Sequence, residues 1–307
     1  MGLGSESIWD RLWQRRGARA ALLVVIVAFL AALWGEAVYR HGQFTGRTPG
    51  YNTVNETQRY LPPAPLRWFD KSAQASGVSP WAYLLGSDNL GRDVLARVVQ
   101  GTRIAFHVGI VTSLIALPLG VILGCLGGYF GGRVDSMVNW LCATVASLPG
   151  LLFILAVALV VGRGLMGLYL GIGFTTWVGV CRNVRAETIK HRDRPYIQAA
   201  QVLGYSSYRI LSHHILPNVA HIVLICFSLR FPAAVATEVF VSFLGIGVQN
   251  EPSWGVMINN ARLRLWQGVW WEMTFVSLAI FALVMSFNVL ADALRDELDP
   301  ALRNSDQ

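Results

Sequence analysis

The sequence predicts an all-α membrane protein, a polytopic bundle of about six transmembrane helices with one polar helical loop. Hydrophobic residues make up 54% of the 307 residues and charged residues only 14%, compared with about 25% charged in soluble proteins. The mean hydropathy is +0.46. Apolar runs approaching the roughly 20 residues that cross a bilayer recur along the chain. Together these features predict a protein whose main partner is the lipid bilayer.

The charged residues and cysteines exclude several other classes of protein. The four cysteines are scattered in or beside apolar runs, with no CxxC pair and no Cys/His cluster. Neither a disulfide framework, a metal site nor a cofactor is therefore expected. The net charge of +7 comes almost entirely from arginines beside the apolar runs. That distribution is typical of the positive-inside rule and argues against nucleic-acid binding.

The first membrane helix is expected over residues 20–38, after a basic tail. The sequence Trp34-Gly35-Glu36 is not a small-residue cleavage site, so this segment is not a signal peptide. Residues 1–103 are expected to contain the tail, this helix and a long external loop. Residues 104–307 are expected to form the transmembrane domain.

The end of the long loop, residues 83–103, reads YLLGSDNLGRDVLARVVQGTR. Asp88 or Asn89 is predicted to cap a helix whose apolar stripe contains Val94, Leu95 and Val98. Taken alone, the charged residues of this segment are typical of a solvated helix face.

The second membrane helix is predicted over residues 104–129, with a kink at Pro118. A glycine recurs every four residues at Gly120, Gly124, Gly128 and Gly132, which favours close packing of a neighbouring helix. No Gly-Lys-Ser or Gly-Lys-Thr follows these glycines, so the chain has no recognisable ATP site.

Four further membrane helices are predicted. The third covers residues 137–161, with Asp135 or Ser136 as its cap and Pro149 inside it, and the fourth covers the Gly-rich residues 165–180. The fifth and sixth cover residues 219–244 and 273–290. The loop between them contains Trp254, Trp266, Trp270 and Trp271, a composition typical of an interfacial aromatic belt.

The longest polar interruption in the second half is residues 195–218, which read PYIQAAQVLGYSSYRILSHHILPN. The small residues Ala199, Ala200 and Gly204 leave a helix surface that another surface can approach closely. Gly204 is predicted to end this helix, and Ser206 or Ser207 to cap a second one.

The second helix of this stretch is predicted to place Tyr208, Leu211 and Ile215 on one face. It is predicted to stop at Pro217, with Asn218 capping the next run. The stretch is then either a helix-turn-helix prepared for a partner or an amphipathic loop that packs on its own protein.

The spacing Ala199-Ala200, three residues, Gly204, then Ile215-Leu216-Pro217 resembles the cytoplasmic coupling motif of ABC importer permeases. In that family the loop docks into a groove on the ATPase subunit. The resemblance implies a coupling loop at about residues 183–218. The implied ATPase contacts are Gln198, Ala199, Ala200, Leu203, Gly204, Ile215, Leu216 and Pro217. The family usually has Glu at the position of Gln198, and this amide lacks the charge of a carboxylate.

Residues 85–97 resemble a signature of the C-type permease subunit of oligopeptide and dipeptide ABC importers. The external signature residues are Asp88, Gly91, Arg92 and Asp93. The resemblance covers residues 84–303. It implies a chain that forms half of a translocation pathway and performs no covalent chemistry. The implied partners are a B-type permease, two ABC ATPase subunits and an extracytoplasmic substrate-binding protein.

Basic residues predict the orientation in a bacterial cytoplasmic membrane. With six helices and both termini cytoplasmic, the internal segments contain Arg11, Arg15, Arg16, Arg19, Arg133, Arg182, Arg185, Lys190, Arg192, Arg194, Arg209, Arg295 and Arg303. The short external loops contain only Arg163, Arg262 and Arg264. This bias places the coupling loop in the cytoplasm.

Arg230 and Glu238 are charged residues within the fifth apolar run. A charge at the bilayer centre costs at least about 2.5–3.5 kcal/mol, so each needs water or a partner of opposite charge. They line the pathway, or they are structural ion pairs that fix helix packing. Eight residues along one helix correspond to about 12 Å of rise, so the two are not expected to pair with each other.

Two other functions are alternatives to the permease. A secondary transporter would carry ion-coupling charges and usually internal repeats, and no convincing repeat is present. A membrane-embedded enzyme would need a cluster of catalytic residues, and no such motif occurs. The substrate stays open at this point: an oligopeptide, a dipeptide, a modified peptide or a non-peptide solute such as a metal chelate.

Overall fold

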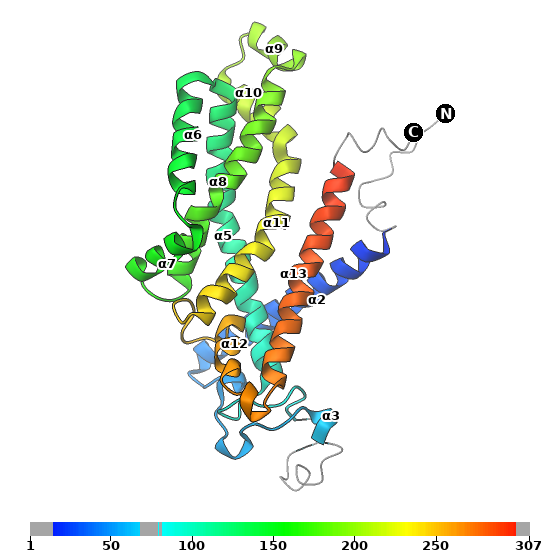
Figure 1. The fold of residues 1–307 in the computed structure, drawn as a ribbon. Helices are drawn as coiled ribbons and strands as arrows, with labels where there is room; N and C mark the ends of the chain where they lie inside the picture. The colour runs from blue at the N-terminus through cyan, green and yellow to red at the C-terminus, as the bar shows by residue number, and fades with distance from the viewer. Residues whose placement is uncertain (1–14, 68–78, 80–81, 299–307) are drawn as a thin grey trace, which may run out of the picture.

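The computed structural model describes residues 15–67, 79 and 82–298. All regular secondary structure in these residues is helical apart from an isolated bridge between Ser87 and Asp93. The helices run side by side around α5 (Val94–Phe130), the longest of them (Figure 1). The predicted all-α bundle is confirmed.

Five helical segments of the described chain are long and apolar enough to cross a membrane. They are α2 (Arg16–Thr45), α5, α8 (Leu165–Arg192), α11 (Leu216–Phe243) together with the turns before it, and α13 (Trp271–Leu298). Helices α6 (Gly132–Ala146) and α7 (Gly150–Val161) are bent by 82° at the break between them and make a sixth span if counted as one.

Short elements occupy the two ends of the bundle. At one end lie α9 (Pro195–Val202) and α10 (Ser207–Ile210) (Figure 1). At the other lie α3 (Ala64–Arg67), α12 (Trp254–Arg262) and three single turns. These turns are η1 (Gly50–Asn52), η2 (Glu56–Gln58) and η4 (Leu265–Gln267).

The start of α2 and the end of α13 lie at the same end of the bundle. Arg15 Nη1 and Asp296 Oδ2 are 2.7 Å apart, and both side chains are exposed. The chain therefore crosses the bundle an even number of times between these residues, which requires α6 and α7 to act as one pass. Arg11 and Arg303, which entered the count of basic residues, lie outside the described residues.

Several helix boundaries differ from the prediction. α2 continues to Thr45 and ends at Gly46, whose φ is +62°. α5 begins at Val94, not Ile104, because Asp93 caps it by accepting hydrogen bonds from the Leu95 and Ala96 amides. The predicted cap at Asp88 or Asn89 is wrong. α8 continues to Arg192, so the basic cluster except Arg194 lies on the helix itself.

The predicted third membrane helix is broken at Pro149. Proline has no N–H to donate and its ring clashes with the preceding turn, so the chain starts a new helix at Gly150. The predicted cap at Asp135 or Ser136 is also wrong, because α6 begins at Gly132. Asp135 instead forms an ion pair with Arg185 of α8, with 2.6 Å between Oδ2 and Nη2.

The four tryptophans do not form one belt. Trp254 and Trp271 are buried, and their indole N–H groups donate to the carbonyls of Val98 and Ser87 at 3.1 and 3.0 Å. Trp266 and Trp270 are exposed. Trp254 therefore fastens α12 to the start of α5, and Trp271 fastens α13 to the external segment just before α5.

Glycines bring α5 and α8 into close contact. A Cβ atom at Gly120 would lie 2.5 Å from Val180 Cβ, and one at Gly124 would lie 2.7 Å from the Cys181 carbonyl oxygen. A Cβ at Gly128 would lie 2.7 Å from Thr188 Cβ. The predicted close packing is confirmed at these three positions. At Gly132 no atom lies within 4 Å of the Cβ position, so the stripe ends before it.

We expect Gly124→Ala to destabilise the protein by about 1–3 kcal/mol, because overpacking forces the two helix backbones apart. The check is thermal unfolding of the purified protein. The control is Gly150→Ala, whose Cβ would meet only Thr175 Cγ2 at 3.4 Å. Equal melting temperatures for the two variants would contradict the packing described for α5 and α8.

Candidate functional site: the α9 loop and the charged groups of the bundle

The α9 loop, residues 193–218, begins with a short helix. Pro195 lies in the first turn of α9, where its missing N–H costs no hydrogen bond. The chain turns at Gly204, whose φ is +76°, and the Ser206 side chain accepts a hydrogen bond from the Arg209 amide at the start of α10. The predicted break at Gly204 is confirmed, and so is a serine cap.

The second helix of the loop does not stop at Pro217. α10 continues through a π-helical turn, η3 (Leu211–Ile215), into α11, and Pro217 lies in the first turn of α11. A π-helical turn is wider than an α-helical turn, so the helix continues although Pro217 has no N–H to donate. Asn218 does not cap the helix, because its Nδ2 donates to the His214 carbonyl at 2.6 Å. These two sequence predictions are wrong.

Two residues of the predicted coupling set are buried and fasten the loop to the bundle. Ala200 is 4% exposed and Ile215 is 0% exposed. They belong to a core cluster with Ile197, Val184 and Val219, which come from α9, α8 and α11. A displacement of α9 would therefore be transmitted to two membrane helices.

The rest of the predicted set is exposed at the end of the bundle. These residues are Gln198, Ala199, Leu203, Gly204, Leu216 and Pro217. Three large apolar side chains protrude with them: Val202 is 88% exposed, Leu203 72% and Tyr208 79%. The prediction that Tyr208 shares a face with Ile215 is wrong, because Ile210 takes the buried position. The sequence prediction missed Val202, although it lies one turn after Ala199 on the same helix.

Glu238 is enclosed by its own chain. It is 1% exposed, and its Oε1 accepts a hydrogen bond from Ser242 Oγ at 2.7 Å. Ser242 Oγ in turn accepts from the Val248 amide at 3.0 Å. These contacts fix the turn after α11 and favour a packing role for Glu238 over a pathway role.

Arg230 has different surroundings. It is half-buried on α11, and its guanidinium lies against Gly179 of α8. It forms no ion pair with Glu238, which confirms the expectation drawn from their spacing along one helix.

Asp88 of the external signature organises a turn. It is 1% exposed, and its Oδ1 accepts hydrogen bonds from the amides of Leu90 and Arg92, both at 2.9 Å. Its Oδ2 accepts from Arg92 Nε at 2.7 Å and lies 3.6 Å from Arg97 Nε. Asp88 and Arg92 therefore fix this turn, and the contact with Arg97 holds it against the start of α5.

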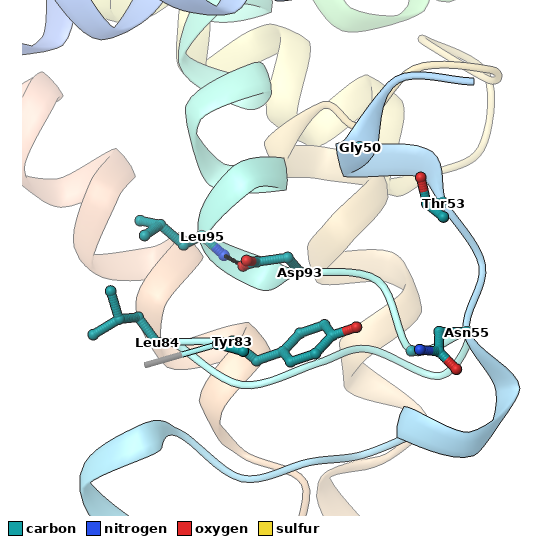
Figure 2. Close-up of a pocket in the computed structure, with 9 residues that line it drawn as sticks. Gly50, Thr53, Asn55, Tyr83, Leu84, Asp93 and Leu95 are labelled. Carbon is teal, nitrogen blue, oxygen red and sulfur yellow. Dashed lines mark hydrogen bonds between the residues drawn. The ribbon is translucent and has the colours of Figure 1, made fainter. Parts of the chain in front are cut away.

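Gly91 and Asp93 lie beside a cavity of about 390 Å³ (Figure 2). Gly91 has a φ of +71°, and a Cβ there would collide with the Asn55 carbonyl. In Figure 2 the Asp93 carboxylate turns back to the Leu95 amide. Burial raises the pKa of the Asp93 carboxyl, against the effect of the hydrogen bonds that it accepts. The four signature residues thus have structural contacts within this chain.

A buried cluster around Arg103 was not predicted. Arg103 is 3% exposed and lies between Glu36, at 3.3 Å, and Glu251, with its guanidinium carbon 3.9 Å from the centre of the Tyr39 ring. It joins α2, α5 and the segment before α12. No spacing rule could have found it, because the partners lie far from Arg103 in the sequence.

The described residues contain no group of three or more His, Cys, Asp or Glu that could hold a metal ion. The described chain instead presents an apolar loop on a multi-pass helical bundle. This arrangement is typical of a membrane subunit that works with a partner outside the membrane.

Residues 116–304 match the family model "Binding-protein-dependent transport system inner membrane component". The chain belongs to this family, whose members are permease subunits and not enzymes. Such a permease works in an ABC system with ATPase subunits and a substrate-binding protein.

Relatives of known function are similar over nearly the whole chain. The dipeptide transport system permease protein DppC of Bacillus subtilis is 33% identical over 97% of this chain and 86% of its own length. The glutathione transport system permease protein GsiD of Pectobacterium atrosepticum is 32% identical, with 97% and 92% covered. The oligopeptide transport system permease protein OppC of B. subtilis is 30% identical, with the same coverage.

One solved structure has a similar fold. It is a crystal structure of an amino acid ABC transporter with histidines, and it matches with a TM-score of 0.51 at 13% identity. The match covers 66% of this chain and 95% of that one. At this identity it supports the fold alone.

We expect Gly91→Ala to loosen the external segment, because its Cβ overlaps the Asn55 carbonyl and the positive φ alone costs about 1–2 kcal/mol. Limited proteolysis of the purified protein should then cut this segment faster. The control is Gly50→Ala, where no atom lies within 4 Å of the Cβ position. Unchanged cleavage in Gly91→Ala would contradict the structural role of the signature.

Proposed function

We propose that this chain is the C-type permease of a peptide-class ABC importer and that the α9 loop is its ATPase-docking surface. The observation that supports the docking surface most directly is the exposure of Val202, Leu203 and Tyr208 on a loop fastened by buried Ala200 and Ile215. Exposed apolar side chains on a rigid base are typical of a protein interface. Their place at one end of the bundle suits a partner outside the membrane (Figure 1).

In this proposal the α9 loop transmits movement of the ATPase into the membrane. The loop packs on α8 and α11 through Ile197, Ala200 and Ile215. α8 is in turn held against α5 by the glycine contacts. ATP-driven closure of the ATPase pair would therefore move three membrane helices together. The pathway would then open alternately to the two sides of the membrane.

The proposal includes further partners. A second permease of the B type would complete the pathway. The positive-inside rule places α9 and both termini in the cytoplasm of a bacterial cell, with the chain in the cytoplasmic membrane. The substrate-binding protein would then meet the opposite end, where residues 46–67 and α12 lie.

The substrate class comes from the relatives, which are named as dipeptide, oligopeptide and glutathione permeases. All three substrates are peptides. The test is uptake by proteoliposomes that contain both permeases, the ATPases and the binding protein. We expect ATP-dependent uptake of a short peptide. Uptake of a metal chelate and not of any peptide would contradict the peptide assignment, and uptake without ATPase subunits would point to a secondary transporter.

We expect Leu203→Asp to weaken association with the ATPase subunits by about 10-fold or more, because burying a leucine contributes about 1.5–3 kcal/mol. The measurement is the amount of ATPase that co-purifies with the permease. The matched control is Leu263→Asp, a similarly exposed leucine (67%) just after α12 at the other end of the bundle. Equal ATPase recovery from both variants would rule out this docking surface.

A further inference from the structure

Arg230 lies where α11 faces α8. A Cβ at Gly179 of α8 would collide with Nη2 of the Arg230 guanidinium. Gly179 therefore leaves space for the Arg230 guanidinium, and any larger residue at this position would fill that space. This space lies within the stretch of α8 and α11 that is apolar enough to cross the membrane.

Arg230 has no counter-ion within the described part of the chain. No carboxylate there forms an ion pair with it, and no group accepts a hydrogen bond from it. Two other arginines of the bundle that are not fully exposed are paired: Arg185 with Asp135, and Arg103 with Glu36 and Glu251. Because an unpaired charge within a membrane is costly, Arg230 needs water or an anion that comes from outside this chain.

The surface around Arg230 consists of small and polar residues. We call it the α8–α11 seam, and it consists of Gly179, Asn183 and Ala186 on α8 with Cys226, Arg230 and Ala233 on α11. The spacings of three and four residues put each set on one helix face. Asn183 Nδ2 lies 3.5 Å from Cys226 Sγ and connects the two sets.

The seam does not have the composition of a lipid-facing surface. Asn183, Ala186 and Ala233 are exposed on it. By contrast, the exposed side chains of α2 are large and apolar, such as Leu23 and Leu30. A polar, small-residue surface in a membrane span is typical of a water-filled path or a contact with another subunit.

We propose that Arg230 is the substrate-recognition residue of this permease and binds the carboxylate of the peptide during transport. This inference rests on the proposed function as a peptide permease. A guanidinium presents a planar fork of donors that matches both oxygens of a carboxylate. Exposed Arg182, one turn beyond Gly179 toward the α9 end, would receive the carboxylate as it leaves Arg230.

The test uses proteoliposomes with the complete importer and two probes, trialanine and trialanine amide. Each peptide is supplied at a concentration that saturates the associated binding protein, so that uptake reports translocation. In Arg230→Gln we expect trialanine uptake to fall about 10-fold or more, the effect of losing a charge-assisted hydrogen bond. Uptake of the amide should stay within about twofold of wild type, and Arg230→Lys should keep most of the trialanine uptake.

Gly179→Ala gives a second variant that keeps the charge. Its Cβ would displace the guanidinium, so it should show the same selective loss for trialanine. The control is Arg133→Gln, which removes an exposed positive charge at the start of α6 and should leave the ratio of the two peptides unchanged.

Equal loss for both peptides in Arg230→Gln, or a reduced yield of the assembled complex, would overturn the proposal. That result would indicate that Arg230 pairs with an acidic side chain of the partner permease. If the wild-type importer takes up neither peptide, the peptide assignment itself has failed. The two failures can be told apart, because equal loss for both peptides can be seen only when the wild-type importer transports them.

Discussion

The close contact between α5 and α8 is the constraint on which the rest of the bundle depends. Three glycines of α5 face Val180, Cys181 and Thr188 so closely that even a methyl group would not fit. With so little side chain between them, the two helices form a rigid central pair (Figure 1). The other helices pack around this pair, and α11 contacts both of its members.

This rigid pair explains how a movement at one end of the molecule can be transmitted to the other end. The α9 loop is fastened to α8 and α11 by a buried apolar cluster, while its exposed surface is free for a partner. At the opposite end, the start of α5 is held by Trp254, Asp88 and Arg97. α5 and α8 thus connect a docking surface on one side to a compact external segment on the other.

The charged groups within the bundle divide into two kinds. Arg103, Glu238 and Asp135 have partners in this chain, and each joins elements that are distant in sequence or fixes a turn. Their ion-pair and hydrogen-bond partners offset part of the cost of burying them. Arg230 is different, because the described chain leaves its guanidinium without an anion. This contrast, and not the presence of charge as such, singles out Arg230.

The sequence by itself determined the fold class, the close packing along the α5 glycines, the Gly204 turn and the family. Each of these follows from local spacing: apolar runs of membrane length, a glycine every four residues, or a fixed motif. Only the tertiary structure decided that Ala200 is buried while Leu203 is exposed, and that Asp88 makes a turn while Asp93 caps α5. It also decided that Pro149 breaks a span while Pro217 does not. The reason is that burial, hydrogen-bond partners and the direction of a chain after a proline depend on neighbouring helices, and residues far away in the sequence provide those neighbours.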